Sequence, residues 1–598
     1  MLTTEQLSQL CFLPDTPLLE LLERQNEAIK SGLPSDIALV VDDSGCLIGT
    51  ITQGDLRRAA IAHRSYDLLA GEVMQQQPIS FPDHLSYKEI IRLLPEELDK
   101  RGRKSKRFLQ MVILIDEAGR PSRLLEYPEL WEQRVASHRH IVVVGMGYVG
   151  FTLAVALADK GFKVSGVDID ADKIALLKQG QSYIHERGLN EIFAEQLGQN
   201  FFPVTEIPED GEVFIITVGT PVAYDSEAGT YLPDLGALRA ASLAVGANLK
   251  PSNLVILRST VPVGTTREFV QPLLEATAGL RAGQEFHLAF APERTAEGKA
   301  IKELRELPQV IGGVNEESVE ATAALFRDLT PTVVRVNSLE QAELVKLINN
   351  TYRDLIFAYA NQVAQIASQF NLDVVETIRA ANQGYPRDPV PLPSPGVGGP
   401  CLTKDPYIFD AVAQQVGAAD TLFSLGRRIN ESMHDFVVSR VREQLVRLRV
   451  RPGEATVLVC GLAFKGNPET GDMRNSSAVE IAHMLRPHIG RLLGHDPVAA
   501  QEEIASFGFE PVGFEAGVKQ ADAVLFLNNH LFYERTNVFD LVRNMRGPAL
   551  VFDGWKLFNP RDVIQAGPCV YMSLSHTLSS VPEASGQVVL KDISHQQS

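Results

Sequence analysis

The stretch HIVVVGMGYVGFTLAVALADKGFKVSGVDID (140–170) decides the fold of the central part of this chain. It is typical of a strand, a glycine turn, a helix and a second strand. Gly145, Gly147 and Gly150 lie at the turn, where glycines let a pyrophosphate approach the amino terminus of the helix. Asp168 closes the next strand, where an acid binds the adenosine ribose hydroxyls and disfavours a 2′-phosphate. The pattern therefore predicts a dinucleotide-binding domain with NAD as its cofactor.

The alternation of apolar runs and helical segments continues beyond this stretch. VFIITV (213–218) and LVILRST (254–260) extend the first α/β pattern, and from about Gln341 the sequence is helical with few breaks. A second alternation starts at ATVLVCGLAF (455–464). We therefore expect an α/β protein with a helical region between two α/β domains.

The amino-terminal segment, residues 1–135, contains a weak internal repeat. A helix-like stretch (18–30) precedes two apolar runs, IALVV (37–41) and LIGTIT (47–52), and the same order recurs more loosely afterwards. This repeat predicts two small α/β units. The basic run RGRKSKR (101–107) between them is expected to be a solvated loop.

Composition limits the classes of function. The 598 residues exceed what one core organises, so three or four domains are expected. A formal charge of −18 argues against a nucleic-acid partner. The sequence has no long apolar run of the kind that forms a signal peptide or a membrane span, so neither is expected. The five cysteines form no CxxC pair, which predicts neither a disulfide framework nor a metal site and favours a cytoplasmic protein.

Cys401, in GVGGPCLTKDP (396–406), is the candidate nucleophile. A lone cysteine is more often an apolar filler, but the glycines let backbone approach a ligand, and Lys404 and Asp405 follow closely. A neighbouring cation lowers a thiol pKa from about 8.5 towards neutrality, so an activated thiol is expected. Cys46, Cys460 and Cys569 have no such neighbours and are interpreted as packing residues.

Two further pairs are candidates for the same site. Lys346 and Asn350 are four residues apart, hence on one helix face, although an exposed surface pair would fit equally well. Glu293 and Glu297 in APERTAEG have the same spacing, but the proline predicts a loop there. Isolated carboxylates of this kind are more often surface residues.

Together the motifs resemble the UDP-glucose/GDP-mannose dehydrogenase family over about residues 139–570. They are GMGYVG (145–150), VGTP (218–221), RSTVPVGTT (258–266), APERTAEG (291–298), ELVKLINN (343–350), GVGGPCLTKD (396–405) and GLAFKGNPETGDMRNSS (461–477). The resemblance implies an NAD-binding Rossmann domain (139–340), a central helical dimerisation region with the cysteine loop (341–450) and a UDP-sugar-binding Rossmann-like domain (451–575). It also implies a homodimer or higher homo-oligomer that oxidises the C6 hydroxyl of a UDP-sugar to a carboxylate. The polar composition of the last stretch (576–598) predicts a disordered tail.

The resemblance assigns chemical roles. Cys401 would attack the C6 aldehyde to give a thiohemiacetal, and a second hydride transfer would give a thioester. Lys346 and Asn350 would stabilise the C6 oxyanion. Asp405 and Thr260 would position or activate water, with Glu297 as a further candidate base. Implied cofactor contacts are Gly145, Gly147, Tyr148, Val149, Gly150, Asp168, Lys173, Thr220, Thr260, Glu293, Lys404 and Arg474, and implied substrate contacts are Glu297, Lys346, Asn350, Arg387, Gly398 and Lys465.

The sugar is less clearly indicated. PER at 292–294 and Arg387 are similar to enzymes acting on UDP-N-acetylhexosamines, whereas Lys404 is similar to the UDP-glucose branch. Many UDP-glucose dehydrogenases have an arginine after FDG that reaches the neighbouring subunit's substrate, but here Trp555 and Lys556 follow. We expect a UDP-N-acetylhexosamine, with UDP-glucose as the other candidate.

The amino-terminal segment resembles a CBS-domain pair, most clearly in ALVVDDSGCLIGTITQGDLRRA (38–59). In that family the T-x-x-D pattern, here Thr52 and Asp55, contacts an adenine nucleotide. The second copy, with LEYPE at 125–129, lacks the pattern. Two interpretations stay open. The segment either binds one adenine nucleotide or is a purely structural pair that aids oligomerisation.

Two other functions compete with the leading one. A two-electron hydroxyacid dehydrogenase would share the Rossmann domain and the Lys-x-x-x-Asn pair, but it would need neither Cys401 nor a third α/β domain. A nucleotide-sensing scaffold with an inactive dehydrogenase body would not be expected to keep the full set of site residues.

Overall fold

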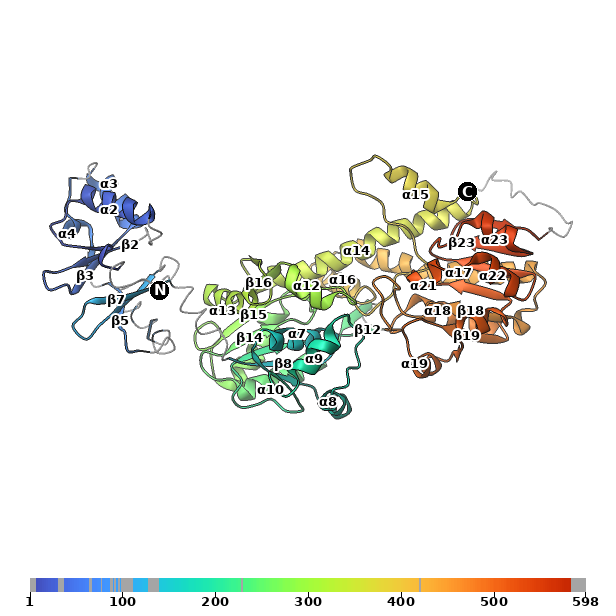
Figure 1. Cartoon of the computed structure of the whole chain (residues 1–598), viewed down its shortest axis with the longest axis horizontal. Coiled ribbons are helices and arrows are strands. Elements are labelled where there is room, and N and C mark those ends of the chain that lie inside the picture. The colour runs from blue at the N-terminus through green and yellow to red at the C-terminus, as the bar shows by residue number, and fades with distance from the viewer. Residues whose placement is uncertain are drawn as a thin grey trace. The chain divides into compact units, whose positions relative to one another are not determined.

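The computed structural model describes residues 7–30, 37–63, 67–76, 78–85, 90, 93–94, 97, 111–126, 139–226, 230–418 and 421–581 (Figure 1). The basic run at 101–107 and most of the polar tail at 576–598 lie outside these ranges. The chain divides into an amino-terminal unit (Met1–Arg139 and Glu320–Asp328) and a larger unit (His140–Val319 and Leu329–Ser598). Within the described ranges, no helix is long and apolar enough to cross a bilayer.

The amino-terminal unit contains two small sheets of similar construction. In each, a short strand pairs in parallel with the first strand of an antiparallel hairpin. Asp42 and Asp116 begin the two hairpin turns, and each carboxylate accepts two backbone N–H groups of its turn. The internal repeat predicted from the sequence is thus confirmed for these hairpins. The elements are β1 (Cys11–Phe12), α2 (Leu18–Lys30), β2 (Ile37–Val41), β3 (Leu47–Thr52), α3 (Gln53–His63), α4 (Ala70–Val73), β4 (Gln75–Gln76), β5 (Ser80–Pro82), β6 (Met111–Ile115) and β7 (Pro121–Glu126).

The first large sheet has the strand order β10-β9-β8-β11-β14-β15-β16-β17. Its first six strands are parallel and follow the 3-2-1-4-5-6 order of dinucleotide-binding folds. The inner strands β11 and β14 are apolar and fully buried because helices cover the sheet, whereas the edge strand β17 is largely exposed. They are β8 (His140–Val144), β9 (Lys163–Val167), β10 (Phe201–Val204), β11 (Val213–Ile216), β14 (Leu254–Leu257), β15 (His287–Phe290), β16 (Gln309–Gly313) and β17 (Val333–Arg335), with the separate hairpin β12 (Val222–Asp225) and β13 (Thr230–Pro233).

The second large sheet repeats this topology near the carboxyl end. Its order is β20-β19-β18-β21-β22-β23-β24, again 3-2-1-4-5-6 for the parallel strands, with β24 antiparallel at the edge. The predicted α/β class with two Rossmann-like sheets is therefore confirmed. The strands are β18 (Thr456–Cys460), β19 (Arg491–His495), β20 (Glu510–Pro511), β21 (Ala523–Phe526), β22 (Ala549–Asp553), β23 (Cys569–Ser573) and β24 (Thr577–Ser579).

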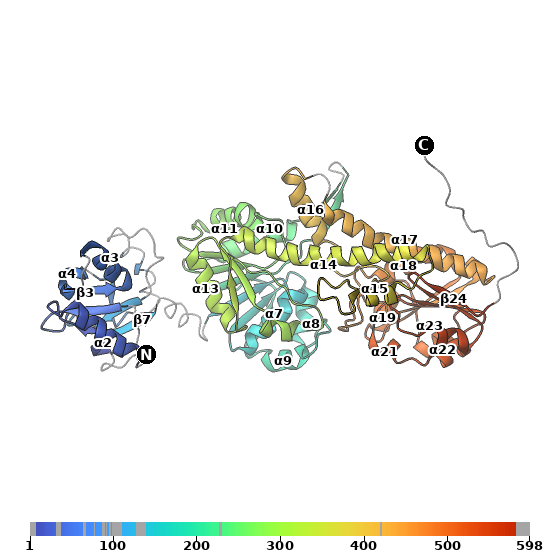
Figure 2. The same ribbon diagram turned by 90° about the horizontal axis from the view of Figure 1, so that it is seen from above.

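Two long helices, α14 (Leu339–Ser368) and α17 (Leu422–Arg447), run side by side between the two sheets (Figures 1 and 2). The Ser338 hydroxyl caps α14 by accepting the Gln341 N–H. Two shorter helices, α15 (Val374–Asn382) and α16 (Asp405–Gln415), flank the loop that carries Cys401. The helical region predicted from about Gln341 is confirmed, and it places the cysteine loop between the two Rossmann-like domains.

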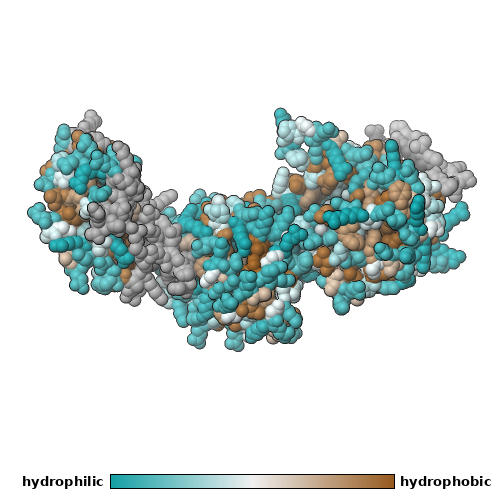
Figure 3. Space-filling model, in the orientation of Figure 1, coloured by the Kyte–Doolittle hydropathy of each residue, from teal (hydrophilic) through white to brown (hydrophobic). Residues whose placement is uncertain are grey.

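The remaining helices cover the sheets. On the face drawn in Figure 3 the surface is mostly hydrophilic, with apolar residues gathered in a few places. The helices are α7 (Tyr148–Asp159), α8 (Ala171–Lys178), α9 (Leu189–Gln196), α10 (Gly236–Asn248), η2 (Thr266–Val270), α11 (Gln271–Ala278), α12 (Ala300–Glu306), α13 (Glu316–Arg327), η3 (Pro452–Glu454), α18 (Ser477–Leu485), η4 (Arg486–His488), α19 (Gln501–Ser506), α20 (Phe514–Val518), α21 (Leu531–Glu534), α22 (Val538–Asn544) and α23 (Pro560–Ala566).

Candidate active site

The glycine turn between β8 and α7 has the form that a dinucleotide needs. Gly145 has φ +98°, and a Cβ on Gly150 would lie 1.8 Å from the Gly145 carbonyl oxygen, so both positions require glycine. A Cβ on Gly147 would meet no atom within 4 Å. Gly147 therefore faces open space at the amino terminus of α7, where free N–H groups favour a pyrophosphate.

Asp168, at the end of β9, supports the same turn. Its Oδ2 accepts the Met146 N–H at 2.8 Å and lies 3.2 Å from Lys173 Nζ. Tyr183 lies nearby, with its hydroxyl bonded to the Met146 carbonyl and its ring 5.9 Å from Lys173 Nζ. Asp168 and Lys173 thus stand together beside the glycine turn.

Glu186 joins the glycine turn to the loop that carries Glu297. Its carboxylate accepts the Gly298 N–H at 2.7 Å and the Ala300 N–H at 3.0 Å, and the Tyr148 hydroxyl donates to it. Burial, reinforced by Glu186, raises the pKa of Tyr148. The sequence predicts that Tyr148 contacts the cofactor. In the structure, its hydroxyl donates a hydrogen bond to Glu186. Glu186 stands in none of the motifs quoted above, so sequence reasoning missed it.

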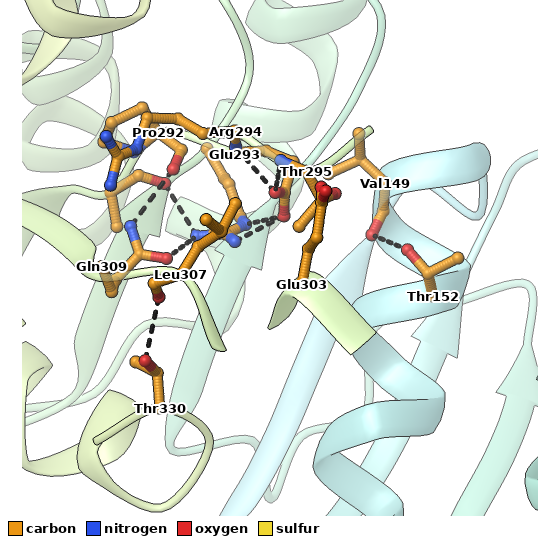
Figure 4. Close-up of polar contacts among 12 residues, drawn as sticks. Val149, Thr152, Pro292, Glu293, Arg294, Thr295, Glu303, Leu307, Gln309 and Thr330 are labelled. Atoms are coloured by element: carbon orange, nitrogen blue, oxygen red, sulfur yellow. Dashed lines mark hydrogen bonds and ion pairs between the residues drawn. The ribbon is translucent and has the colours of Figure 1, made fainter. Parts of the chain in front are cut away.

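Glu293 organises the loop before Glu297 from within the core (Figure 4). It is buried, pairs with Arg258 at 2.5 Å, and accepts the N–H groups of Arg294 and Thr295, each at 2.7 Å. Burial raises the pKa of Glu293, but Arg258 and the N–H donors outweigh it and leave the pKa below its usual range. Glu293 is therefore a charged anchor of the loop.

The same close-up places the loop's neighbours. The Gln309 amide donates to the Pro292 carbonyl at 3.1 Å, and on α7 the Thr152 hydroxyl donates to the Val149 carbonyl at 3.2 Å (Figure 4). The Arg294 guanidinium bonds to the carbonyl of Pro308. Arg294 of the PER motif thus contacts its own domain.

Cys401 is surrounded by charged residues from four segments. Asn350 Nδ2 donates to Asp405 Oδ2 at 2.5 Å, and Lys404 Nζ lies 2.7 Å from Asp405 Oδ1, so the buried Asp405 is held on both sides. The groups whose charges act on Cys401, or on which its charge acts, are Glu297, Lys346, Lys404, Asp405, Lys465 and Arg474. The structure therefore brings most of the catalytic candidates together.

Cys401 is exposed, but its surroundings raise the pKa of the thiol instead of lowering it as the sequence predicts. Desolvation by the surrounding protein raises the pKa of Cys401, and Asp405 and Glu297 raise it further. Lys346 lowers the pKa more than Lys404 does, and Lys404 is ion-paired with Asp405. The prediction that Lys404 brings this pKa towards neutrality was wrong, since desolvation and two carboxylates outweigh the cations.

Glu297 lies where the two Rossmann-like domains meet. Its Oε1 accepts the Thr470 hydroxyl at 3.0 Å, and its backbone carbonyl accepts Lys465 Nζ at 2.5 Å. Burial and the nearby Asp472 raise its pKa to about 7. A carboxyl group with this pKa can exchange a proton near neutral pH. Arg474 stands beside it, bound through its guanidinium to Asp472.

The glycines before Cys401 are required by packing against protein. A Cβ on Gly398 would lie 2.5 Å from the Asn475 carbonyl oxygen, and the Gly399 N–H donates to that oxygen at 3.0 Å. Gly399 also has φ +96°. The expectation that these glycines let backbone approach a ligand needs correction for Gly398, because its missing side chain makes room for the second Rossmann-like domain.

Some candidates stand apart from the Cys401 group. The buried Thr220 hydroxyl donates to the Thr260 carbonyl at 2.5 Å, which fixes the backbone before the PVGTT turn. Arg387 is exposed on the loop after α15. Among the described residues, no hydrogen bond or ion pair links the Thr260 or Arg387 side chain to Cys401. Lys556 pairs with Asp373, and the Trp555 indole donates to the Leu527 carbonyl at 2.9 Å.

In the amino-terminal unit, Thr52 and Asp55 bond to each other. Asp55 Oδ2 accepts both the N–H and the hydroxyl of Thr52, at 2.8 and 2.5 Å. Its Oδ1 accepts Arg58 at 2.5 Å and the Gln75 amide at 3.0 Å. These four bonds fill the acceptor sites of the carboxylate. The geometry favours a structural cap for α3 at this position.

Comparisons with known proteins agree with this geometry. Models of the UDP-glucose/GDP-mannose dehydrogenase family match the NAD binding domain at residues 139–330, the central domain at 340–432 and the UDP binding domain at 458–560. A CBS domain model matches residues 8–62, the first half of the predicted pair.

Curated proteins and solved structures of similar sequence span the same region. The chain is 34% identical over 431 residues to a UDP-N-acetyl-D-mannosamine dehydrogenase of Pyrococcus horikoshii, covering 72% of this chain and 96% of the relative. It is 32% identical over 400 residues to an NDP-N-acetyl-D-galactosaminuronic acid dehydrogenase of Ralstonia nicotianae, covering 66% and 91%. A solved UDP-D-ManNAc dehydrogenase from Pyrococcus horikoshii has a TM-score of 0.65 at 32% identity, over 73% of this chain and 99% of that one. A UDP-glucose dehydrogenase from Pyrobaculum islandicum has a TM-score of 0.64 at 28% identity, over 74% and 99%.

Proposed function

Because this chain belongs to the UDP-glucose/GDP-mannose dehydrogenase family and oxidises a UDP-sugar with NAD, we propose that Cys401 carries the sugar through a covalent four-electron oxidation at C6. The observation that carries this proposal is the convergence of Lys346, Asn350, Asp405 and Glu297 on Cys401. A single oxidation of an alcohol needs no thiol, whereas conversion of an aldehyde to an acid benefits from a soft nucleophile.

The first half of the proposed mechanism forms the covalent bond. The glycine turn would hold NAD, which would supply the oxidant, and the two oxidation stages together would consume two NAD molecules per sugar. Cys401 Sγ attacks the C6 aldehyde, which gives a thiohemiacetal whose oxygen carries negative charge. Lys346, the strongest of the cations acting on the thiol, and Asn350 stabilise that oxygen and favour the thiolate.

The second half releases the acid. Loss of the second hydride leaves a thioester, and water attacks its carbonyl carbon. Glu297, with its pKa of about 7, accepts the proton of that water. Collapse of the intermediate frees the sugar carboxylate and returns Cys401 as a thiol. Asp405, held by Asn350 and Lys404, orients these donors and keeps their charges balanced.

We propose a UDP-N-acetylhexosamine as the sugar substrate. Relatives named for N-acetylmannosamine and N-acetylgalactosaminuronic acid derivatives support this choice. The side chains after the FDG motif support it as well, since Trp555 and Lys556 are bonded within their own chain and do not project outwards as a substrate-binding arginine would.

A homodimer formed through α14 is the proposed assembly. Ile348, Tyr352, Tyr359, Ile366 and Phe370 are exposed, and their spacings of four and seven residues place them on one face of the helix or just past its end. An exposed apolar stripe of this kind marks a protein contact site.

Light scattering should give twice the chain mass for the wild type. Tyr359→Asp should give the mass of a single chain, because the charge disrupts the apolar stripe. Tyr385→Asp changes an exposed tyrosine outside this helix and should remain a dimer.

The experiment that tests the function is an endpoint assay of NADH with limiting UDP-sugar. The panel contains UDP-glucose, UDP-N-acetylglucosamine, UDP-N-acetylmannosamine and UDP-N-acetylgalactosamine. We expect two NADH per sugar from an N-acetylhexosamine, and loss of the second NADH in Cys401→Ala. One NADH with accumulating aldehyde in the wild type would favour the two-electron dehydrogenase. No NADH from any sugar would favour the inactive scaffold.

A further inference from the structure

Arg427 of α17 is a fully buried arginine placed directly behind the cysteine loop. One guanidinium nitrogen donates to Asp354 Oδ1 at 2.9 Å and to the Leu402 carbonyl at 3.1 Å. The other terminal nitrogen donates to the Val397 carbonyl at 2.8 Å. Burying a guanidinium is costly unless its charge and its donors are matched, so these contacts define where the side chain lies.

The two carbonyl oxygens bracket the nucleophile. Val397 and Leu402 stand on either side of the segment from Gly398 to Cys401, and a single rigid side chain bonds to both. On its other side, the same segment is held by the Asn475 carbonyl, which accepts the Gly399 N–H at 3.0 Å. The loop is therefore fixed between α17 and the second Rossmann-like domain.

A buried polar network fixes Arg427 in turn. Asp354 of α14 also accepts the Asn430 amide at 2.9 Å, and Asn430 accepts the Asn361 amide at 2.9 Å. Asn361 Oδ1 accepts the Ser394 N–H at 2.8 Å, near the middle of the loop between α15 and α16. The same pair of helices thus holds the loop at Ser394, Val397 and Leu402.

We propose that Arg427 is the positioning residue that sets Cys401 Sγ against Lys346 and Asn350. It acts through the carbonyls of Val397 and Leu402 and touches none of the reacting groups. Its planar fork can bond to both carbonyls and Asp354 at once, which a lysine ammonium cannot reproduce. The inference rests on the proposed function, because it assumes that Cys401 is the nucleophile.

Arg427→Lys in the full chain tests the inference, with Arg428→Lys as the matched control. Arg428 is the next residue of the same helix and is exposed. Three quantities are measured: kcat and KM, the NADH yield per sugar, and the rate at which iodoacetamide alkylates Cys401, followed by peptide mass spectrometry. The alkylation rate reports on the thiol without any catalysis.

For Arg427→Lys we expect kcat to fall about 100-fold, the scale of a nucleophile displaced by about 1 Å. The KM for NAD should stay within about twofold, because the glycine turn is untouched, and such a split is not expected of a general loss of folding. The NADH yield should fall towards one per sugar. Alkylation of Cys401, which is exposed in the wild type, should become slower, because the loosened loop moves the thiol away from Lys346, the cation that most lowers its pKa. Arg428→Lys should match the wild type in every measurement.

The inference is overturned if Arg427→Lys matches Arg428→Lys in both kcat and alkylation rate. If Arg427→Lys does not fold, Asp354→Asn replaces it, because it weakens the hold on Arg427 while keeping the side-chain shape. Wild-type kcat and alkylation in Asp354→Asn would then overturn the inference. Cys401→Ala separates the two claims: two NADH per sugar from that variant would refute the proposed function, whatever Arg427→Lys does.

Discussion

Asn350 and Asp405 are joined by a hydrogen bond of 2.5 Å between Nδ2 and Oδ2, although 55 positions separate them in the chain. The bond links α14 to the first turn of α16, immediately after Cys401. Asp405 is fully buried, and its other oxygen is paired with Lys404. The proposed oxyanion donor Asn350, the proposed nucleophile Cys401 and the paired Asp405 therefore belong to one arrangement, which is completed only when the two helices pack.

Asn350→Ala should damage both catalysis and stability. The variant removes one donor from the site of the developing oxyanion, a change that lowers kcat roughly 100-fold or more. It also leaves Asp405 Oδ2 without this partner, at a cost of about 1–3 kcal/mol. Asn349→Ala, in the exposed residue beside it, should keep wild-type kcat and melting temperature. Equal kcat for the two variants in steady-state assays would contradict the role given to Asn350.

The raised pKa of Glu297 predicts how kcat depends on pH. Its pKa of about 7 means that kcat should rise with pH through about 7, as the base becomes ionised. Glu297→Gln should lose this limb of the profile along with most of kcat. Glu306→Gln, at an exposed carboxylate nearby, should retain the limb. An unchanged limb in Glu297→Gln would assign the titration to another group.

The same shift predicts a change in stability. Because the pKa of Glu297 is higher in the folded chain than the unfolded value of about 4.3, folding takes up a proton. The stabilisation by the protonated carboxyl is fully present below about pH 4.3 and is lost as the pH rises through about 7. As the pH rises from about 5 to about 8, the melting temperature of Glu297→Gln should therefore increase relative to that of the wild type. A constant difference across this range would mean that the carboxyl is not buried in solution.

Glu343, on the same helix as Lys346, is predicted to stabilise the fold. Its buried carboxylate accepts the N–H groups of Gly264 and Thr266, at 2.6 and 2.8 Å. Glu343→Ala leaves both donors unpaired, so the melting temperature should fall by roughly 4–8 °C if the cost is about 2 kcal/mol. Glu340→Ala, which removes a surface pair with Arg267, should change it by about 2 °C or less. Scanning calorimetry on the two variants measures the contrast.

Asp55 is predicted to act as a cap in the amino-terminal unit. Asp55→Ala removes the acceptor of the Thr52 N–H and hydroxyl, so this unit should lose about 1–2 kcal/mol of stability. Since all four acceptor sites of Asp55 are filled, titration with ATP, AMP or S-adenosylmethionine should give no heat that depends on Asp55. Binding heat in the wild type that disappears in Asp55→Ala would restore the nucleotide site.

Local patterns were enough to predict much of the fold. The turn at Gly145 and the helix from about Gln341 follow from periodicity and glycine placement, because both depend on residues close together in sequence. The grouping of Cys401 with Lys346 and Asn350 came from the order of the motifs and not from any periodicity, since these residues meet only through tertiary packing.

Other features were beyond sequence reasoning. Glu186 and Arg427 stand in no quoted motif, and each acts through backbone groups of distant segments. The raised pKa of Cys401 was missed because the cation beside it in sequence, Lys404, is ion-paired with Asp405, and only the folded structure shows the desolvation. The role of Gly398 was also misjudged, because its close neighbour is the Asn475 carbonyl, 77 positions away.

Trapping the covalent intermediate tests the central claim most directly. The enzyme would be mixed with NAD and the active UDP-sugar, quenched in acid within the first turnovers, digested, and examined by mass spectrometry at the Cys401 peptide. We predict a sugar acyl thioester on Cys401 in the wild type, at higher occupancy in Glu297→Gln, where hydrolysis is slowed. An unmodified Cys401 peptide in both proteins, with two NADH still formed per sugar, would contradict the account.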